Sequence, residues 1–107
     1  MSAATELTSS NFDAIVSEGV TLIDFWAEWC NPCRMMTPVV DDLAAQYGDK
    51  AKVAKVNVDN EQDLAMKFNV SSIPTFLVVK DGEVTRRFVG VTSKAELAKA
   101  VDAALGA

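Results

Sequence analysis

The sequence predicts an α/β fold in which a mixed central β-sheet is covered by helices on both faces. Segments with helical spacing of apolar residues alternate with short, nearly continuous apolar segments, which are typical of buried strands. An Asp81-Gly82 pair between two further strand-like segments indicates a hairpin, because this pair suits a two-residue turn that needs positive φ. Parallel and antiparallel strands are therefore expected to share one sheet.

The first half of the chain contains the signals for two helices and two buried strands. The segment 10–13, Ser-Asn-Phe-Asp, indicates the start of a helix that ends at Gly19. Residues 20–26 form a nearly continuous apolar run, which is typical of a strand covered on both faces. Beyond a turn that carries both cysteines, apolar residues recur at helical spacing up to Gly48, and residues 52–58 indicate the second buried strand.

The second half is expected to contain a short helix and a hairpin. Asp59 is expected to cap the short helix. The apolar residues of this helix are Leu64, Ala65 and Phe68. Residues 76–80 and 83–89 flank the Asp-Gly turn and are expected to pair as antiparallel strands.

A final helix and an edge strand complete the expected fold. Residues 93–96, Ser-Lys-Ala-Glu, form a capping box that opens the last helix. The side chains expected to point inward from it are Leu97, Val101 and Leu105. Residues 5–7 can add an edge strand to the sheet.

The composition limits the size and the partners of the protein. Its 107 residues, half of them hydrophobic, correspond to a single domain over residues 1–107. The net charge of −5 repels nucleic acid, so nucleic-acid binding is not expected. The N-terminus has no secretory signal and no apolar run has the length of a membrane span, so we expect a cytoplasmic protein without membrane contact. In a reducing cytoplasm a permanent disulfide is not maintained.

The motif Cys30-Asn31-Pro32-Cys33 lies where a buried strand passes into a helix. Amide hydrogens and the positive end of the helix dipole stabilise a thiolate at that position, which lowers the Cys30 pKa from its free value of roughly 8.5. Cys33 lies one turn on, within reach of a disulfide, and is expected to be the more buried of the two cysteines. Cys30 is therefore the predicted nucleophile, and Cys33 resolves the mixed disulfide that Cys30 forms with a substrate.

Three other uses of the two cysteines compete with redox chemistry. A structural disulfide across so short a loop removes little entropy from the unfolded chain. A zinc site needs about four ligands, and two cysteines without any histidine supply them only in a dimer. Two inert core cysteines remain as the third alternative, although a charged flank and a helix start are unusual surroundings for them. A Cys-x-x-Cys motif between a strand and a helix of a predicted βαβ unit favours the redox interpretation.

The motifs together resemble those of the thioredoxin family. They are Asp24-Phe25-Trp26-Ala27-Glu28-Trp29-Cys30-Asn31-Pro32-Cys33-Arg34, Pro38, Ile73-Pro74-Thr75, Gly82 and Gly90. The resemblance spans about residues 12–105 and implies the thioredoxin fold, general reduction of protein disulfides without a bound cofactor, and re-reduction by an NADPH-dependent flavoprotein thioredoxin reductase. Asn31 stands where most of the family has glycine, which can displace the reduction potential.

The resemblance also assigns roles outside the cysteine motif. Asp24 matches a buried carboxylate that exchanges a proton with Cys33, and Lys55 matches a lysine near it. Independently, a carboxyl group desolvated in an apolar strand has a raised pKa and can act as a base near neutrality. The alternative for Asp24 is a carboxylate neutralised by Lys55. Trp26 is expected to be a structural core residue.

A substrate-binding surface is implied around the cysteines. Pro74 matches a cis-proline that faces the disulfide, and an X-Pro bond is the place where a cis bond is least costly. Ile73 and Thr75 are implied to present backbone to an extended substrate segment. The remaining members of this weakly selective surface are Trp29, Asn31, Pro32, Gly90 and Val91.

The sequence predicts a reductant rather than an oxidant. Strongly oxidising relatives usually carry histidine before the second cysteine, whereas this chain has Pro32 there and no histidine at all. A less stabilised thiolate gives a more stable disulfide and a better electron donor. We expect a monomer that acts on disulfide-containing proteins. The alternative function is a binding module whose cysteines only report redox state, and a zinc-bridged dimer is a third hypothesis.

Overall fold

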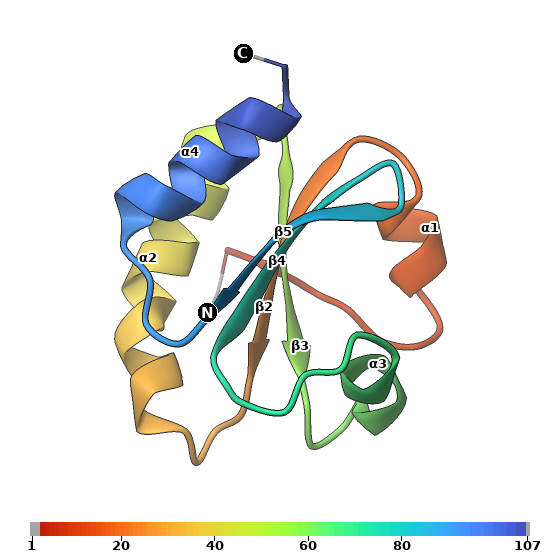
Figure 1. Ribbon diagram of the computed structural model, residues 1–107, viewed down its shortest axis with the longest axis vertical. Helices are drawn as coiled ribbons and strands as arrows, with labels where there is room; N and C mark the ends of the chain where they lie inside the picture. Colours follow the sequence, from red (N-terminus) through yellow and green to blue (C-terminus); the bar gives the residue numbers. More distant parts are fainter. Residues whose placement is uncertain (1–2, 107) are drawn as a thin grey trace.

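The computed structural model describes residues 3–106, and Figure 1 shows its sheet between two pairs of helices. Its elements are β1 (Thr5–Glu6), α1 (Phe12–Val16), β2 (Val20–Trp26), α2 (Asn31–Tyr47), β3 (Lys52–Asn57), α3 (Gln62–Lys67), β4 (Thr75–Lys80), β5 (Glu83–Val89) and α4 (Lys94–Ala104). The predicted succession of helices and strands is confirmed, including the edge strand near the N-terminus.

The five strands form one mixed sheet in the order β1-β3-β2-β4-β5. β3 pairs in parallel with β1 and β2, whereas β4 pairs antiparallel with β2 and β5. β2 is therefore the central strand, with a parallel neighbour on one side and an antiparallel neighbour on the other. In Figure 1, α2 and α4 cover one face of the sheet, and α1 and α3 cover the other. The predicted α/β architecture with helices on both faces is confirmed.

Alternating side chains of β2 enter two separate hydrophobic cores, because successive strand residues point to opposite faces. Leu22 packs with residues of α2 and α4, including Leu43 and Leu97. Ile23 and Phe25 pack in a second cluster with residues of α1 and α3. This burial on both faces explains why β2 is almost continuously apolar, and it makes buried Asp24 an exception.

The ends of the helices follow local chemistry. The Ser93 hydroxyl accepts a hydrogen bond from the Glu96 backbone N–H at 3.2 Å, which confirms the predicted start of α4. Gly48 ends α2 with φ of +53°. In the β4–β5 turn, Asp81 and Gly82 have φ of +50° and +86°, as a two-residue hairpin turn of this kind requires.

Two local predictions are wrong. Asp59 does not cap α3, whose N-cap is Glu61. A turn comes first, in which the Asn57 carbonyl accepts hydrogen bonds from the backbone N–H groups of Asn60 and Glu61. Leu105 does not point into the core: it is the C-terminal cap of α4 and is 38% exposed. The predicted strand bounds near Val58 and Thr75 also differ by one residue from the observed ones.

Within residues 3–106, none of the helices combines the length and the apolar character needed to cross a bilayer.

Two adjacent methionines of α2 provide a test of the core. Met36 is 2% exposed and packs in the core between α2, α4 and the sheet, whereas Met35 is 67% exposed. We expect Met36→Ala to lower the free energy of unfolding by about 2–5 kcal/mol, because a buried side chain leaves a cavity. Met35→Ala on the same helix is the control, with a change within about 0.5 kcal/mol. Denaturant unfolding of the oxidised proteins measures both, and equal effects would contradict this packing.

Candidate functional site

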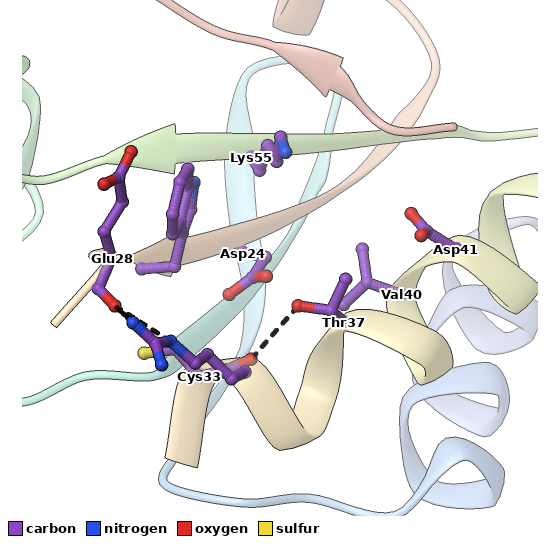
Figure 2. Close-up of a pocket in the computed structure, with 9 residues that line it drawn as sticks. Asp24, Glu28, Cys33, Thr37, Val40, Asp41 and Lys55 are labelled. Carbon is purple, nitrogen blue, oxygen red and sulfur yellow. Dashed lines mark hydrogen bonds between the residues drawn. The ribbon is translucent and has the colours of Figure 1, made fainter. Parts of the chain in front are cut away.

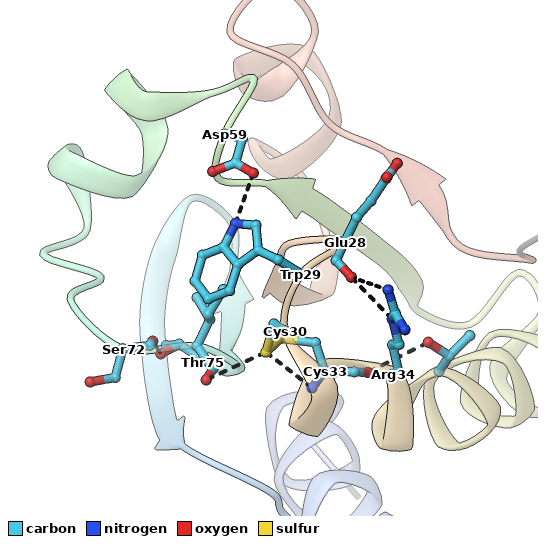
Figure 3. Close-up of a disulfide and its surroundings, with 10 residues drawn as sticks. Glu28, Trp29, Cys30, Cys33, Arg34, Asp59, Ser72 and Thr75 are labelled. Atoms are coloured by element: carbon cyan, nitrogen blue, oxygen red, sulfur yellow. Dashed lines mark hydrogen bonds between the residues drawn. A yellow bond between two sulfur atoms is a disulfide. The ribbon is translucent and has the colours of Figure 1, made fainter.

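The two cysteines lie at the junction of the central strand with the longest helix. β2 ends at Trp26, and Cys30 and Cys33 are joined by a disulfide with a Cα–Cα distance of 5.2 Å. Together with Ala27 they form a small buried cluster, against which Ile73 packs. Figure 3 shows the disulfide at the first turn of α2, with Trp29 beside it.

Cys30 is the N-cap of α2, and its sulfur accepts a hydrogen bond from the Cys33 backbone N–H at 3.2 Å. An N-cap acceptor satisfies a helical N–H group that otherwise has no partner. This geometry favours negative charge on the Cys30 sulfur, because both the N–H group and the helix dipole point their positive ends toward it. The position of Cys30 at the helix start is as predicted.

Asn31 and Pro32 occupy the first two helical positions and are both exposed. Among the described residues, the hydrogen bond to the Cys30 sulfur comes from the Cys33 backbone, and the Asn31 side chain supplies none. The expected difference in burial between the cysteines is not found in the disulfide form, in which Cys30 is 4% and Cys33 3% exposed. The bond between the sulfurs holds both in the same buried cluster.

A second loop closes over the disulfide. The Ile73–Pro74 peptide bond is cis, and the Ile73 carbonyl oxygen lies 3.8 Å from the Cys30 sulfur. The Pro74 carbonyl accepts the Gly90 backbone N–H at 2.8 Å, which joins this loop to the segment after β5. Thr75 is buried in β4, where its register partners are Phe25 and Val89. Ile73 lies outside the strands, whereas Thr75 has a strand partner on each side.

Exposed apolar side chains surround these loops. Trp29 directly precedes Cys30 and is 66% exposed, and Val91 directly follows Gly90 and is 57% exposed. The Trp29 indole N–H donates a hydrogen bond to the Asp59 carboxylate at 3.0 Å, as Figure 3 shows. Asp59 is thus a member of the site, although the sequence predicted it as the cap of a helix. A long-range contact of this kind leaves no local sequence signal.

Arg34 also belongs to the site and was not predicted as a site residue. Its guanidinium donates two hydrogen bonds to the Glu28 backbone carbonyl, at 3.0 Å from Nε and 2.7 Å from Nη2. These bonds tie the segment before Cys30 to the first turn of α2. They thereby limit the movement of Cys30 relative to the start of α2.

A cavity of about 260 Å³ lies behind the disulfide (Figure 2). Its lining residues are Asp24, Trp26, Glu28, Cys33, Arg34, Thr37, Val40, Asp41 and Lys55. Figure 2 shows the Asp24 carboxylate between Lys55 on β3 and Cys33 at the start of α2. The structure therefore brings the predicted group of Asp24, Cys33 and Lys55 to one cavity. Trp26 is half-buried and borders this cavity rather than lying wholly in the core.

Asp24 is 5% exposed, and its burial raises its pKa from 3.8 to about 7. The nearby Lys55 charge lowers the Asp24 pKa, but by less than desolvation raises it. The Lys55 ammonium lies 5.0 Å from the centre of the Trp26 ring and makes no ion pair with Asp24 within residues 3–106. Desolvation therefore outweighs the charge of Lys55 in setting the Asp24 pKa.

The described part of the chain has no group of three or more Cys, Asp and Glu side chains arranged to hold a metal ion. The titratable groups near the disulfide instead suit proton exchange, since a carboxyl group with a pKa near 7 can hold or release a proton at neutral pH.

Comparison with known proteins identifies the family. The family described as Thioredoxin matches residues 3–103 of this chain. The thioredoxin of Bacillus subtilis (strain 168) is 48% identical over 100 residues, which cover 94% of this chain and 96% of that protein. The thioredoxin of Staphylococcus haemolyticus (strain JCSC1435) is 47% identical with the same coverage. The chain belongs to the thioredoxin family and is a protein thiol–disulfide oxidoreductase.

Proposed function

We propose that this protein acts mainly as a reductant of protein disulfides, with Cys30 as the nucleophile and Cys33 as the resolving thiol. The observation that carries the proposal is the place of Cys30 as N-cap of α2, where its sulfur accepts the Cys33 N–H. Pro32 before the second cysteine and the absence of histidine support the reducing direction.

The exchange takes place in two displacements. The Cys30 thiolate attacks one sulfur of a substrate disulfide, forms a mixed disulfide and releases the other substrate sulfur as a thiolate. Cys33 then loses its proton and attacks the Cys30 sulfur, which breaks the mixed disulfide and releases the second substrate thiol. Two electrons pass to the substrate, and the Cys30–Cys33 disulfide is left. The second step is intramolecular and therefore fast.

Asp24 is proposed as the base that takes the Cys33 proton, directly or through water in the cavity. Asp24 and Cys33 line the same cavity, and burial gives the Asp24 carboxyl a pKa of about 7. A base with a pKa near the working pH is ionised in part and still binds a proton well. Lys55 is proposed to assist as a nearby charge that is not ion-paired with Asp24, which keeps part of the Asp24 population in the carboxylate form while the pKa stays near 7.

The substrate segment is proposed to lie along the loop that faces Cys30. Ile73 offers backbone outside the strands, and its carbonyl already lies 3.8 Å from the Cys30 sulfur. Strand addition at Ile73 gives affinity with little sequence preference. The other proposed contact residues are Trp29, Asn31, Pro32, Pro74, Thr75, Gly90 and Val91, of which Trp29 and Val91 supply exposed apolar surface.

The proposed partners are disulfide-containing proteins and an NADPH-dependent thioredoxin reductase that returns the Cys30–Cys33 disulfide to the dithiol. Membership of the thioredoxin family supports both kinds of partner. We also propose that the protein works as a monomer in the cytoplasm. The net charge of −5 disfavours nucleic acid as a partner.

Cysteine variants separate the two sulfur roles. We expect Cys33→Ser to accumulate a mixed disulfide between Cys30 and a disulfide substrate, because no thiol remains to resolve it. Cys30→Ser is the matched control and is expected to trap none. Non-reducing electrophoresis with mass spectrometry measures the adduct. If the Cys30→Ser protein traps as much substrate at Cys33 as the Cys33→Ser protein traps at Cys30, the assignment is contradicted. Partner binding that survives the loss of both cysteines would favour the binding-module alternative.

The proposed role of Asp24 predicts a pH-dependent loss of rate. In Asp24→Asn, resolution of the mixed disulfide is expected to slow by about 10- to 100-fold near pH 7, because Cys33 loses its base. The difference should shrink above pH 9, where solvent removes the thiol proton. Stopped-flow quenching at several pH values measures the rate. Equal rates at pH 7 would remove Asp24 from the mechanism.

Folding stability provides an independent control for the same substitution. The folded Asp24 pKa of about 7 lies above the ordinary 3.8, so the folded state binds this proton more tightly than the unfolded state. Its contribution to stability is fully present below about pH 4 and is lost as the pH rises through about 7. Oxidised Asp24→Asn is therefore expected to exceed the parent in stability by up to about 4 kcal/mol at pH 8. The same stability in both proteins at pH 8 would contradict the raised pKa.

The exposed position of Asn31 predicts a small effect on redox equilibrium. A hydrogen bond from its amide to a charged sulfur would contribute about 1.5–3 kcal/mol, which is at least tenfold in the equilibrium constant. Because no such bond is present among the described residues, Asn31→Gly is expected to change the equilibrium with glutathione by less than about threefold. A tenfold shift toward the disulfide form would indicate that Asn31 stabilises the Cys30 thiolate after all.

A further inference from the structure

Asp24 and Lys55 are opposite charges on neighbouring strands that do not pair. They are direct register partners between β2 and β3, and both side chains line the cavity behind Cys33. Opposite charges on neighbouring strands attract each other, and more strongly where water is excluded. Nevertheless, residues 3–106 contain no ion pair between them. The Lys55 ammonium lies elsewhere, against another side chain.

The side chain in contact with the Lys55 ammonium is that of Trp26. The Lys55 ammonium lies over the Trp26 ring, 5.0 Å from its centre, which is the geometry of a cation–π interaction. Trp26 lies two residues after Asp24 in β2, so both side chains are on the same face of the sheet. Lys55 can therefore reach either the indole face or the carboxyl group, and in this structure it contacts the indole.

We propose that Trp26 is a positioning residue whose indole face holds the Lys55 ammonium beside the cavity and keeps it from forming an ion pair with Asp24. The indole thereby preserves the Asp24 carboxyl as a group that can both take up and release a proton. If the ammonium were released, it would approach the carboxyl and hold it in the ionised form, which weakens it as a base. This catalytic consequence rests on the proposed role of Asp24, whereas the positioning itself does not.

The polar atoms of the cavity support this assignment. Asp24 Oδ1 and Trp26 Nε1 are buried, and neither has a hydrogen-bond partner within the described part of the chain. The Asp24 carboxyl thus has an oxygen without a donor, and the Lys55 ammonium could supply one. The indole contacts Lys55 through its ring and not through its N–H group. An unsatisfied buried acceptor is costly, so a donor within reach would bond to it unless another interaction competed for that donor.

The other charged groups that face Asp24 do not replace Lys55. α2 contributes Arg34 and Asp41, and the segment after β2 contributes Glu28. The Arg34 guanidinium is bound to the Glu28 carbonyl. β4 faces Asp24 with Phe76, its apolar register partner. Among all these neighbours, the charge that lowers the Asp24 pKa is that of Lys55, so the position of its ammonium sets the electrostatic effect.

Direct titration of Asp24 tests the proposal in the oxidised protein, where neither cysteine titrates. The parent protein, Trp26→Leu, Trp26→Phe, Lys55→Met and the double variant Trp26→Leu/Lys55→Met are labelled with ¹³C in the aspartate carboxyl groups. Their chemical shifts are followed by NMR from pH 4 to pH 10, and Asp24→Asn identifies the signal. Amide spectra and thermal unfolding show whether each variant is folded.

The expected result depends on the presence of Lys55. Trp26→Leu should lower the Asp24 midpoint by about one pH unit, because the released ammonium pairs with the carboxyl. Trp26→Phe keeps a ring face and should shift it by less than half of that. In the Lys55→Met background, Trp26→Leu should produce no lowering. An equal lowering of the Asp24 midpoint in both backgrounds would show that Trp26 only excludes water from Asp24. No lowering with Lys55 present would show that Trp26 does not hold the ammonium. Either result overturns the proposal.

A second probe keeps the proposal testable if the leucine variant does not fold. Replacing tryptophan by a ring-fluorinated analogue weakens the attraction of the indole face for a cation and retains its shape. A lowering of the Asp24 midpoint, smaller than in Trp26→Leu, is expected in the parent and none in Lys55→Met, and its absence in the parent counts against the proposal. Disulfide turnover is measured alongside. A shifted midpoint with unchanged turnover would confirm the positioning by Trp26 and contradict the catalytic role of Asp24.

Discussion

The hydrogen bond from the Cys33 backbone N–H to the Cys30 sulfur sets the geometry on which the site depends. It makes Cys30 the N-cap of α2, so one sulfur atom both starts the longest helix and lies at the positive end of its dipole. The two following positions hold Asn31 and Pro32, and Pro at the start of a helix loses no hydrogen bond. Reactivity and helix initiation are thus linked in one contact.

A second constraint comes from the place of Asp24 in β2. This strand is the middle one of the sheet and packs into a hydrophobic core on each face, so a carboxyl group there loses water. Desolvation raises its pKa to about 7, at a cost in folding stability that increases with pH. The other residues of β2 apart from Thr21 are apolar, and their burial on both faces offsets this cost. A more exposed strand would leave the carboxyl group fully ionised at neutral pH.

The sequence was sufficient for features that depend on local pattern. The bounds of β2 followed from a nearly continuous apolar run, the hairpin from Asp81-Gly82, and the place of Cys30 from a strand followed by a helix. Local pattern failed where a distant residue competes for a side chain. Asp59 resembled a helix cap, but its carboxylate accepts the Trp29 indole N–H, and Lys55 contacts Trp26 although its register partner is Asp24. Contacts between loops and across strands depend on tertiary packing, which periodicity does not encode.

The two sulfurs face different surroundings, and this difference suits the proposed sequence of steps. Cys30 lies against the Ile73 carbonyl on the side of exposed Trp29, where a large protein can approach. Cys33 borders the cavity with Asp24, which is partly enclosed and suits a proton better than a protein. In the proposed mechanism the substrate therefore exchanges electrons on one side of the disulfide while the proton moves on the other. Because neither process needs the space of the other, the proton can leave Cys33 while the substrate is still joined to Cys30.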